Sequence, residues 1–381
     1  MQTDRAYISG GRLGDGLRAL QTEVGRLLVE FSGAGAEWLD PPALLPADVL
    51  IDLYGEDLRG RAYTTQDPEQ GEMMLRPDFT VPVVQLHMKG GSEPARYMYY
   101  GPVWRRQDAG SNRPNEYLQV GFERFDRGDA AQIDAELFVQ MRHALGNVNV
   151  QAATGDMGIL RAAVEGLTTS PARRAALMRH LWRPVRFKHL LERFSHKPKP
   201  SAARSAMLDA AKAGKLDAFL ANAGPMIGLR DGDDIAARAQ ILLDDATQPP
   251  LLADEVAVLN EVLALAGMMD AVAPKLDALA DAMPALRPAY SQFATRAAAL
   301  RAAGVDTAHL PFEASFGRTS LEYYDGFVFE FHAVGRDDLP QIAQGGRYDA
   351  LTAVLGGGQG IPAIGCIIRP EALLALKGGA T

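Results

Sequence analysis

The chain has 381 residues, which suits one large domain with an insertion, or two domains. Its net charge of -8 argues against nucleic acid as a main partner, because a phosphate backbone attracts a basic surface. The single cysteine, Cys366, excludes an intrachain disulfide, and neither a signal peptide nor a long apolar stretch is present. We therefore expect a cytoplasmic protein that binds neither nucleic acid nor membrane.

The first part of the chain begins with a helical pattern. Apolar residues spaced three and four apart predict a helix from Leu13 to Phe31. From Leu50 to Gly128 the pattern is typical of strands and turns, with a hairpin around the turn-rich sequence QDPEQG at residues 66–71.

Two longer strands are expected on either side of residue 110. The runs 96–105 and 117–125 are rich in aromatic and β-branched residues, and a polar loop separates them. This arrangement predicts an antiparallel pair. Asp129 then stands at the position expected for the N-terminal cap of the next helix.

Composition changes between residues 155 and 304, where alanine and leucine dominate and helical spacing recurs. We predict a core formed by residues 1–154 and 305–381, interrupted by a helical insertion at 155–304. Within it, the stretch 161–204 is rich in basic side chains. They form either a docking patch for a partner or a phosphate ligand, or a solvated helical face beside a flexible loop.

Strand patterns return after Pro311. Residues 327–331 alternate so that three phenylalanines share one face, and residues 361–368 form another apolar run. Pro370 begins a short final helix. The whole pattern predicts an α+β fold with a mostly antiparallel sheet, flanking helices and a helical insertion.

The strand that begins at Tyr117 carries the first candidate site. Because side chains alternate, Gln119, Gly121 and Glu123 share one face. An amide and a carboxylate then flank a residue without a side chain, which leaves a notch suited to a small polar ligand. The alternative is an exposed strand face with an incidental glycine.

Other polar side chains lie in nearby segments. Arg105 ends the neighbouring strand and could hold a carboxylate or phosphate, or form a surface ion pair. Asp78 and Thr80 alternate in LRPDFT, where Asp78 could accept hydrogen bonds from an ammonium group or cap a turn. Of the adjacent Tyr323 and Tyr324, one should point inward, toward a ligand or as a structural side chain.

The glycine-rich run at residues 344–365 permits tight turns and close backbone approach. Its spacing fits neither the dinucleotide-binding fingerprint nor the P-loop. The seven histidines and one cysteine show no metal-ligand spacing. We expect no metal and no cofactor.

Taken in order, these segments resemble the class II aminoacyl-tRNA synthetases, and their histidyl branch in particular. MLRPDFT resembles the LRPEGT element of that branch, and YYGPVWRRQ with EYLQVGFERF resembles its second motif. SLEYYDGFVFEF resembles its RGLDYY signature, and GGRYDALTAVLGGGQGIPAIG its third motif. The resemblance covers the whole chain, and its specificity lies in the combination.

The resemblance implies a pocket for histidine. The residues assigned to it are Asp78, Thr80, Arg105, Gln119, Glu123, Tyr323 and Tyr324. Asp78, Thr80 and Gln119 would hold the ammonium group and Arg105 the carboxylate. Glu123 and Tyr324 would bind the imidazole.

The positions that handle ATP in the synthetases have changed. Gln107 replaces the glutamate of the second motif, and Thr319 replaces the arginine of RGLDYY, with Arg318 one residue out of register. The third motif has Arg369 for glycine and Ala372 for arginine. Loss of one preorganised charge-stabilising donor typically costs about 10²–10³ in rate. We therefore expect no aminoacylation activity.

The retained and lost residues together resemble the regulatory subunits of ATP phosphoribosyltransferase, the first enzyme of histidine biosynthesis. In that family the synthetase-like subunit forms homodimers, activates a short catalytic subunit and transmits feedback inhibition by histidine. The sequence stops where the anticodon-binding domain of the histidyl branch would begin, so we expect none. The alternatives are a degenerate histidyl-tRNA synthetase and a paralogue that activates an amino acid for another acceptor.

Overall fold

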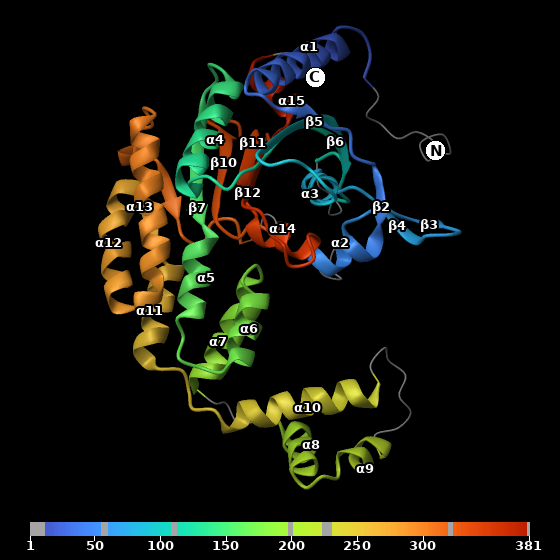
Figure 1. The fold of residues 1–381 in the computed structure, drawn as a ribbon, viewed down its shortest axis with the longest axis vertical. Helices are drawn as coiled ribbons and strands as arrows, with labels where there is room; N and C mark the ends of the chain where they lie inside the picture. The colour runs from blue at the N-terminus through green and yellow to red at the C-terminus, as the bar shows by residue number, and fades with distance from the viewer. Residues whose placement is uncertain are drawn as a thin grey trace.

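The computed structural model describes residues 12–54, 60–107, 113–196, 201–222, 231–318 and 323–378. Within these ranges the largest sheet has nine strands, and it lies in the upper half of the view in Figure 1. Its neighbours are antiparallel except for two parallel pairs, β1 with β5 and β7 with β9. This sheet and its helices confirm the predicted α+β class. The strand order is β1 (Glu37–Trp38), β5 (Ala95–Trp104), β6 (Glu116–Phe125), β12 (Ala363–Ile368), β11 (Ala343–Arg347), β10 (Phe327–Ala333), β7 (Val150–Asp156), β9 (Pro311–Glu313) and β8 (Ala266–Met268).

A second, small sheet has the order β2 (Leu44–Pro46), β4 (Gly71–Leu75) and β3 (Thr64–Asp67). Its strands β3 and β4 form the hairpin predicted around residues 66–71, with Asp67 opposite Gly71. The predicted antiparallel pair of long strands is also confirmed, as β5 and β6. Both predictions rest on local turn chemistry, which the sequence displays directly.

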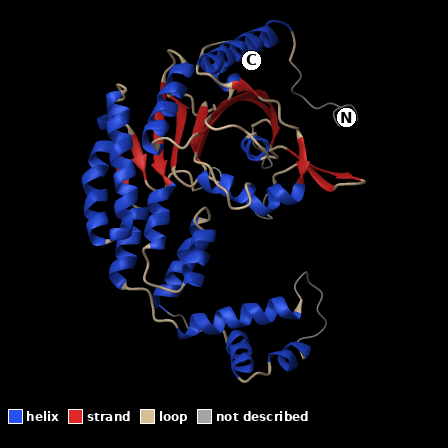
Figure 2. Cartoon of the chain, in the orientation of Figure 1, coloured by secondary structure: helices blue, strands red, loops and turns tan. Residues whose placement is uncertain are grey.

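Apolar cores lie on both faces of the large sheet. One core includes residues of α1 (Gly14–Gly33), α4 (Ala130–Leu145) and α15 (Pro370–Leu376). The other includes residues of α2 (Ala47–Tyr54), α3 (Thr80–Met88) and α14 (Asp349–Leu355). The three phenylalanines of β10 lie on one face, as predicted, in the first of these cores. The layers are visible in Figure 2.

Helices dominate the segment from 157 to 302, and α8–α10 lie far from the sheet (Figure 1). Among the described residues of this segment, only β8 joins the large sheet. The proposed division into a core and a 155–304 insertion stays a prediction. No helix in the described ranges combines the length and apolar composition needed to cross a membrane. The helices are α5 (Met157–Glu165), α6 (Pro171–Arg179), α7 (Pro184–His196), α8 (Ala202–Lys212), α9 (Leu216–Ala221), α10 (Gly232–Thr247), α11 (Ala253–Leu263), α12 (Met269–Ala282) and α13 (Arg287–Ala302), with 3₁₀ turns at Pro284–Leu286 and Thr307–His309.

The interpretation of residues 50–128 as strands and turns was incomplete, because helices α2 and α3 lie in or overlap this range. The sequence of α3, TVPVVQLHM, is rich in β-branched residues, which normally favour strands. Most of its residues are buried, so no polar face marks the helical period. Pro82 stands in the first turn, where a proline is tolerated.

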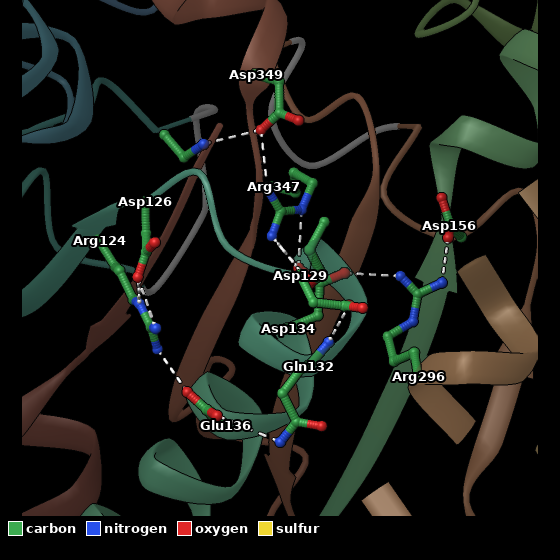
Figure 3. Close-up of polar contacts among 12 residues, drawn as sticks. Arg124, Asp126, Asp129, Gln132, Asp134, Glu136, Asp156, Arg296, Arg347 and Asp349 are labelled. Atoms are coloured by element: carbon green, nitrogen blue, oxygen red, sulfur yellow. Dashed lines mark hydrogen bonds and ion pairs between the residues drawn. The ribbon is translucent and has the colours of Figure 1, made fainter. Parts of the chain in front are cut away.

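A buried ion network joins the helical segment to the sheet (Figure 3). Arg296 of α13 donates to Asp134 of α4 at 2.9 Å and to Asp156, which caps α5 at the end of β7. Arg347 of β11 donates to the same Asp134, with Nη2 at 2.6 Å, and to Asp349 at 3.1 Å. Asp134 therefore accepts from two arginines that come from different elements, Arg296 from α13 and Arg347 from β11.

Candidate functional site

Six of the seven residues predicted to bind a ligand line one cavity beside the large sheet. The cavity has a volume of about 10 Å³, close to the space that one water molecule needs. A larger ligand would therefore require the lining side chains to move apart. The lining residues are Asp78, Thr80, Arg105, Gln119, Tyr323, Tyr324, Gln344, Cys366 and Ile367.

The segment between β4 and α3 brings Asp78 and Thr80 to the cavity. Arg76 anchors this segment, since its guanidinium donates to the carbonyl oxygens of Pro41 at 2.6 Å and Pro102 at 3.1 Å. The Arg76 guanidinium also lies 3.9 Å from the centroid of the Phe79 ring. These contacts hold Arg76 and Phe79, which flank Asp78 in the sequence.

Arg105 lies at the end of β5 and borders the same cavity. Its Nε donates to the carbonyl oxygen of Pro77 at 2.7 Å, and its Nη2 lies 3.9 Å from Oδ2 of Asp78. A cation and an anion thus stand side by side at the cavity. Such a pair is complementary to a zwitterion, whose ammonium and carboxylate carry the opposite charges.

Gln119 supplies a buried amide from β6. It is 1% exposed, and its Oε1 has no hydrogen-bond partner in the part of the chain that the structure describes. A buried acceptor without a partner costs free energy comparable to that of a lost hydrogen bond. A donor on a bound ligand, such as an ammonium group, would satisfy it.

Glu123, the seventh predicted residue, lies behind the cavity lining and is fully buried. Its carboxylate accepts hydrogen bonds from Thr80 at 3.0 Å, Tyr99 at 2.9 Å and Tyr348 at 2.5 Å. Burial raises the pKa of Glu123 to about 7, although these three hydroxyls lower it. Glu123 does not line the cavity itself, but it accepts a hydrogen bond from Thr80, which does.

The predicted notch at Gly121 is filled by a neighbouring side chain. Tyr99 stands opposite Gly121 across β5 and β6, and a Cβ at Gly121 would lie only 2.1 Å from Cζ of the Tyr99 ring. The glycine therefore makes room for the tyrosine that hydrogen-bonds Glu123. A second glycine, Gly365, makes room for Glu123 itself, since a Cβ there would lie 1.4 Å from its Oε2.

Both adjacent tyrosines border the cavity, although the sequence predicted that one would point inward. The hydroxyl of Tyr323 donates to Oγ1 of Thr80 at 3.3 Å. Burial raises the pKa of Tyr324 well above its ordinary value. Thr319, which replaces the arginine of the synthetase signature, lies outside the described residues. Arg318 donates to the carbonyl oxygen of Leu181 at 2.6 Å and is not among the lining residues.

Three lining residues were missed by sequence reasoning: Gln344, Cys366 and Ile367. Gln344 stands opposite Ile367 across β11 and β12. The glycine-rich run 344–365 was interpreted through its glycines, as tight turns and close backbone approach, and its Gln344 side chain was given no role. Because side chains alternate along a strand, Gln344 and Gly346 of β11 lie on the same face, as Gln119 and Gly121 of β6 do. A Cβ at Gly346 would lie 2.7 Å from the Tyr324 ring, which borders the cavity. That alternation is the signal that could have identified Gln344.

In the described residues, no group of three or more His, Cys, Asp or Glu side chains could hold a metal ion. The cavity therefore consists of one ion pair, two amides, hydroxyls and apolar surface. This set can bind a small polar molecule through charge and hydrogen bonds.

Comparisons with known proteins agree on the family and the fold. The family model described as histidyl-tRNA synthetase matches residues 15–223 and 184–373. The ATP phosphoribosyltransferase regulatory subunit of Agrobacterium fabrum is 31% identical over 370 residues, covering 93% of this chain and 96% of that protein. The protein of the same name from Brucella anthropi is 30% identical, covering 90% and 94%.

Solved structures show the same fold at lower identity. The structure described as an ATP phosphoribosyltransferase regulatory subunit/histidyl-tRNA synthetase from Bacillus halodurans has a TM-score of 0.65 at 18% identity. The match covers 96% of this chain and 81% of that one. A histidyl-tRNA synthetase from a Nostoc species has a TM-score of 0.60 at 16% identity, covering 98% and 75%.

Proposed function

Because the chain belongs to the family of ATP phosphoribosyltransferase regulatory subunits, we propose that it activates a short-form ATP phosphoribosyltransferase and mediates feedback inhibition by histidine. The observation that carries the histidine part is the cavity, in which Asp78, Arg105 and the buried Oε1 of Gln119 meet. These groups complement the two charged groups of an amino acid. The catalytic partner is proposed from the name that the relatives carry, and the homodimer from the resemblance of the sequence to the family.

The small volume of the cavity suggests how histidine could act as an effector. A ligand shifts an equilibrium only if it binds one state more tightly than the other. The described state leaves about 10 Å³ between the lining side chains, so histidine would select a state in which they stand further apart. By reciprocity, an active assembly that favours the closed state binds histidine more weakly.

We also propose that the chain has no aminoacylation activity of its own. The departures at Gln107, Arg369 and Ala372 remove groups that handle ATP in the synthetases which this chain resembles. In the structure, Arg369 is 9% exposed and its guanidinium lies 5.2 Å from the centroid of the Tyr117 ring. A buried side chain of this size supports the loss of a nucleotide pocket at that position.

The proposal is tested by mixing the purified protein with the short phosphoribosyltransferase from the same source. Phosphoribosyl-ATP formation should rise on mixing and fall again when histidine is added. A Gln119→Leu variant should still activate, because the fold is kept, but its response to histidine should be weakened. The matched control, Gln132→Leu on the exposed surface of α4, should behave as the unchanged protein.

If the rate does not change on mixing and the two proteins fail to co-elute, the regulatory proposal is wrong. The alternative, a degenerate synthetase, predicts histidine-dependent exchange of pyrophosphate with ATP by this protein alone. The amino-acid-activating paralogue predicts the same exchange with a different amino acid. Both assays use the full chain, so they separate the three functions directly.

A further inference from the structure

Arg369 is a buried cation on the cavity side of the sheet. Its guanidinium lies over the ring of Tyr117, and Tyr117 shares one face of β6 with Gln119, two residues further on. The antiparallel register pairs Ile368 with Val120, so Arg369 follows at the level of Gln119. Gln119 lines the cavity, and Arg369 is therefore its neighbour across the strands.

A second connection runs through two glutamines. Nη1 of Arg369 donates to the carbonyl oxygen of Gln341 at 3.3 Å. Nε2 of Gln341 donates to Oε1 of Gln344 at 2.8 Å, and Gln344 lines the cavity. Because its carbonyl oxygen already accepts this bond, the Gln344 amide is held in one orientation. Arg369 thus contacts two residues, Tyr117 of β6 and Gln341 before β11, that lie next to the lining residues Gln119 and Gln344.

The positive charge of Arg369 lacks a close counterion. Within the described residues it forms no salt bridge at 4.0 Å or less, and its buried Nε has no hydrogen-bond partner. Burial lowers the pKa of Arg369; Tyr117 and Glu330 raise it, while Arg105 and Arg113 lower it further. A buried charge with an unsatisfied donor is costly unless an anion compensates it.

We propose that Arg369 binds the carboxylate of the amino-acid ligand. This inference rests on the proposed function, and it changes the expected role of Arg105. Arg105 is already bonded to Pro77 and faces Asp78 at 3.9 Å, so part of its charge is compensated. Among the described residues, Arg369 has no carboxylate within 4.0 Å, and Glu330 and Glu371 act on it from a greater distance. A carboxylate between Arg105 and Arg369 would satisfy the buried Nε and relieve the repulsion between the two guanidinium groups.

The test compares histidine with histamine, which keeps the imidazole and the ammonium group but has no carboxylate. Binding of both is measured by calorimetry on the unchanged protein and on Arg369→Gln. The variant should bind histidine roughly 10- to 100-fold more weakly, the usual effect of losing a charge-assisted hydrogen bond. Its affinity for histamine should stay within about twofold. Arg336→Gln, at a partly exposed arginine after β10 that pairs with Asp338, is the matched control and should change neither.

Equal weakening of histidine and histamine, or no weakening of either, overturns the role of Arg369 while histidine binding itself stands. If the unchanged protein binds no histidine, both this inference and the proposed histidine response fail. Removal of a buried cation without a counterion need not destabilise the fold. Should Arg369→Gln nevertheless fail to fold, Arg369→Lys provides the same comparison, with histidine weakened and histamine unchanged.

Discussion

Glu123 shows how one buried residue organises the floor of the cavity. Three hydroxyls donate to its carboxylate, from Thr80 of α3, Tyr99 of β5 and Tyr348 between β11 and α14, so three segments of the chain are bonded to one side chain. Two glycines, Gly121 and Gly365, are needed to accommodate this arrangement. The polar residues that line the cavity therefore depend on a group that lies beneath them.

The raised pKa of Glu123 predicts a specific pH dependence of stability. In the folded protein the carboxyl titrates at about 7, against 4.5 ordinarily. Unfolding therefore releases a proton between these values, and the free energy of unfolding should fall as pH rises from 4.5 to 7. The total loss is roughly 3 kcal/mol at most. Above pH 7 this contribution should be constant.

Glu123→Gln isolates this effect, because glutamine has nearly the same shape and no charge to titrate. Urea unfolding of both proteins between pH 4.5 and 8 should show the variant gaining stability relative to the unchanged protein as pH rises. A stability difference that does not depend on pH would mean that Glu123 titrates near its ordinary value.

At the site, the sequence indicates which residues of one segment share a face. It does not indicate which side chains of neighbouring strands lie against them. Asp78, Thr80 and Gln119 follow from motifs and from the period of two. The filling of the Gly121 notch by Tyr99 depends on the register between β5 and β6. A period identifies a face, but only the register decides which side chain occupies the space above a glycine.

Among whole elements, those with a distinct local signal were predicted and those buried on all sides were not. The hairpin β3–β4 and the cap of α4 follow from turn and cap residues, and Asp129 indeed accepts from the backbone N–H of Gln132. Helix α3 is buried on most sides and lacks a polar face, so its sequence does not show the alternation of apolar and polar residues that indicates a helix. An element could therefore be predicted where a turn, a cap or a solvent-exposed face places characteristic residues in the sequence.

The contact between α13 and the sheet predicts an unequal effect of two arginines on one helix. Arg296 is 2% exposed and bonds Asp134 and Asp156, whereas Arg301 is exposed and pairs with Asp270 at 2.9 Å. Arg296→Met leaves buried carboxylates with less compensation and should lower the free energy of unfolding by roughly 3–5 kcal/mol. Arg301→Met should cost less than about 1 kcal/mol.

Urea unfolding of the two variants at pH 5 and pH 8 tests this prediction. Burial already raises the pKa of Asp156, and Arg296 opposes that rise. Without Arg296 the carboxyl should stay protonated to higher pH, so the loss of stability should be greater at pH 8 than at pH 5. Similar losses for both variants would show that the network contributes little to the attachment of α13.

At the scale of the whole molecule, the large sheet ends in a strand that suits a second copy of the chain. In the described residues β1 pairs only with β5, which leaves its other edge unpaired. Trp38 in this strand is 54% exposed, and Val29 on α1 is 73% exposed. Exposed strand edges with large apolar side chains promote association. These features support the proposed homodimer, with β1 and α1 at its interface.

Charge substitutions at two equally exposed apolar residues test this interface. Trp38→Glu places a second carboxylate beside Glu37 at the edge of the sheet, so two copies brought together there would repel each other. Leu252, just before α11, is also 54% exposed and provides the matched control. Light scattering after gel filtration should give twice the chain mass for the unchanged protein and for Leu252→Glu, and a monomer for Trp38→Glu. A Trp38→Glu protein that remains dimeric would exclude the β1 edge as the contact, and a monomeric unchanged protein would exclude the homodimer itself.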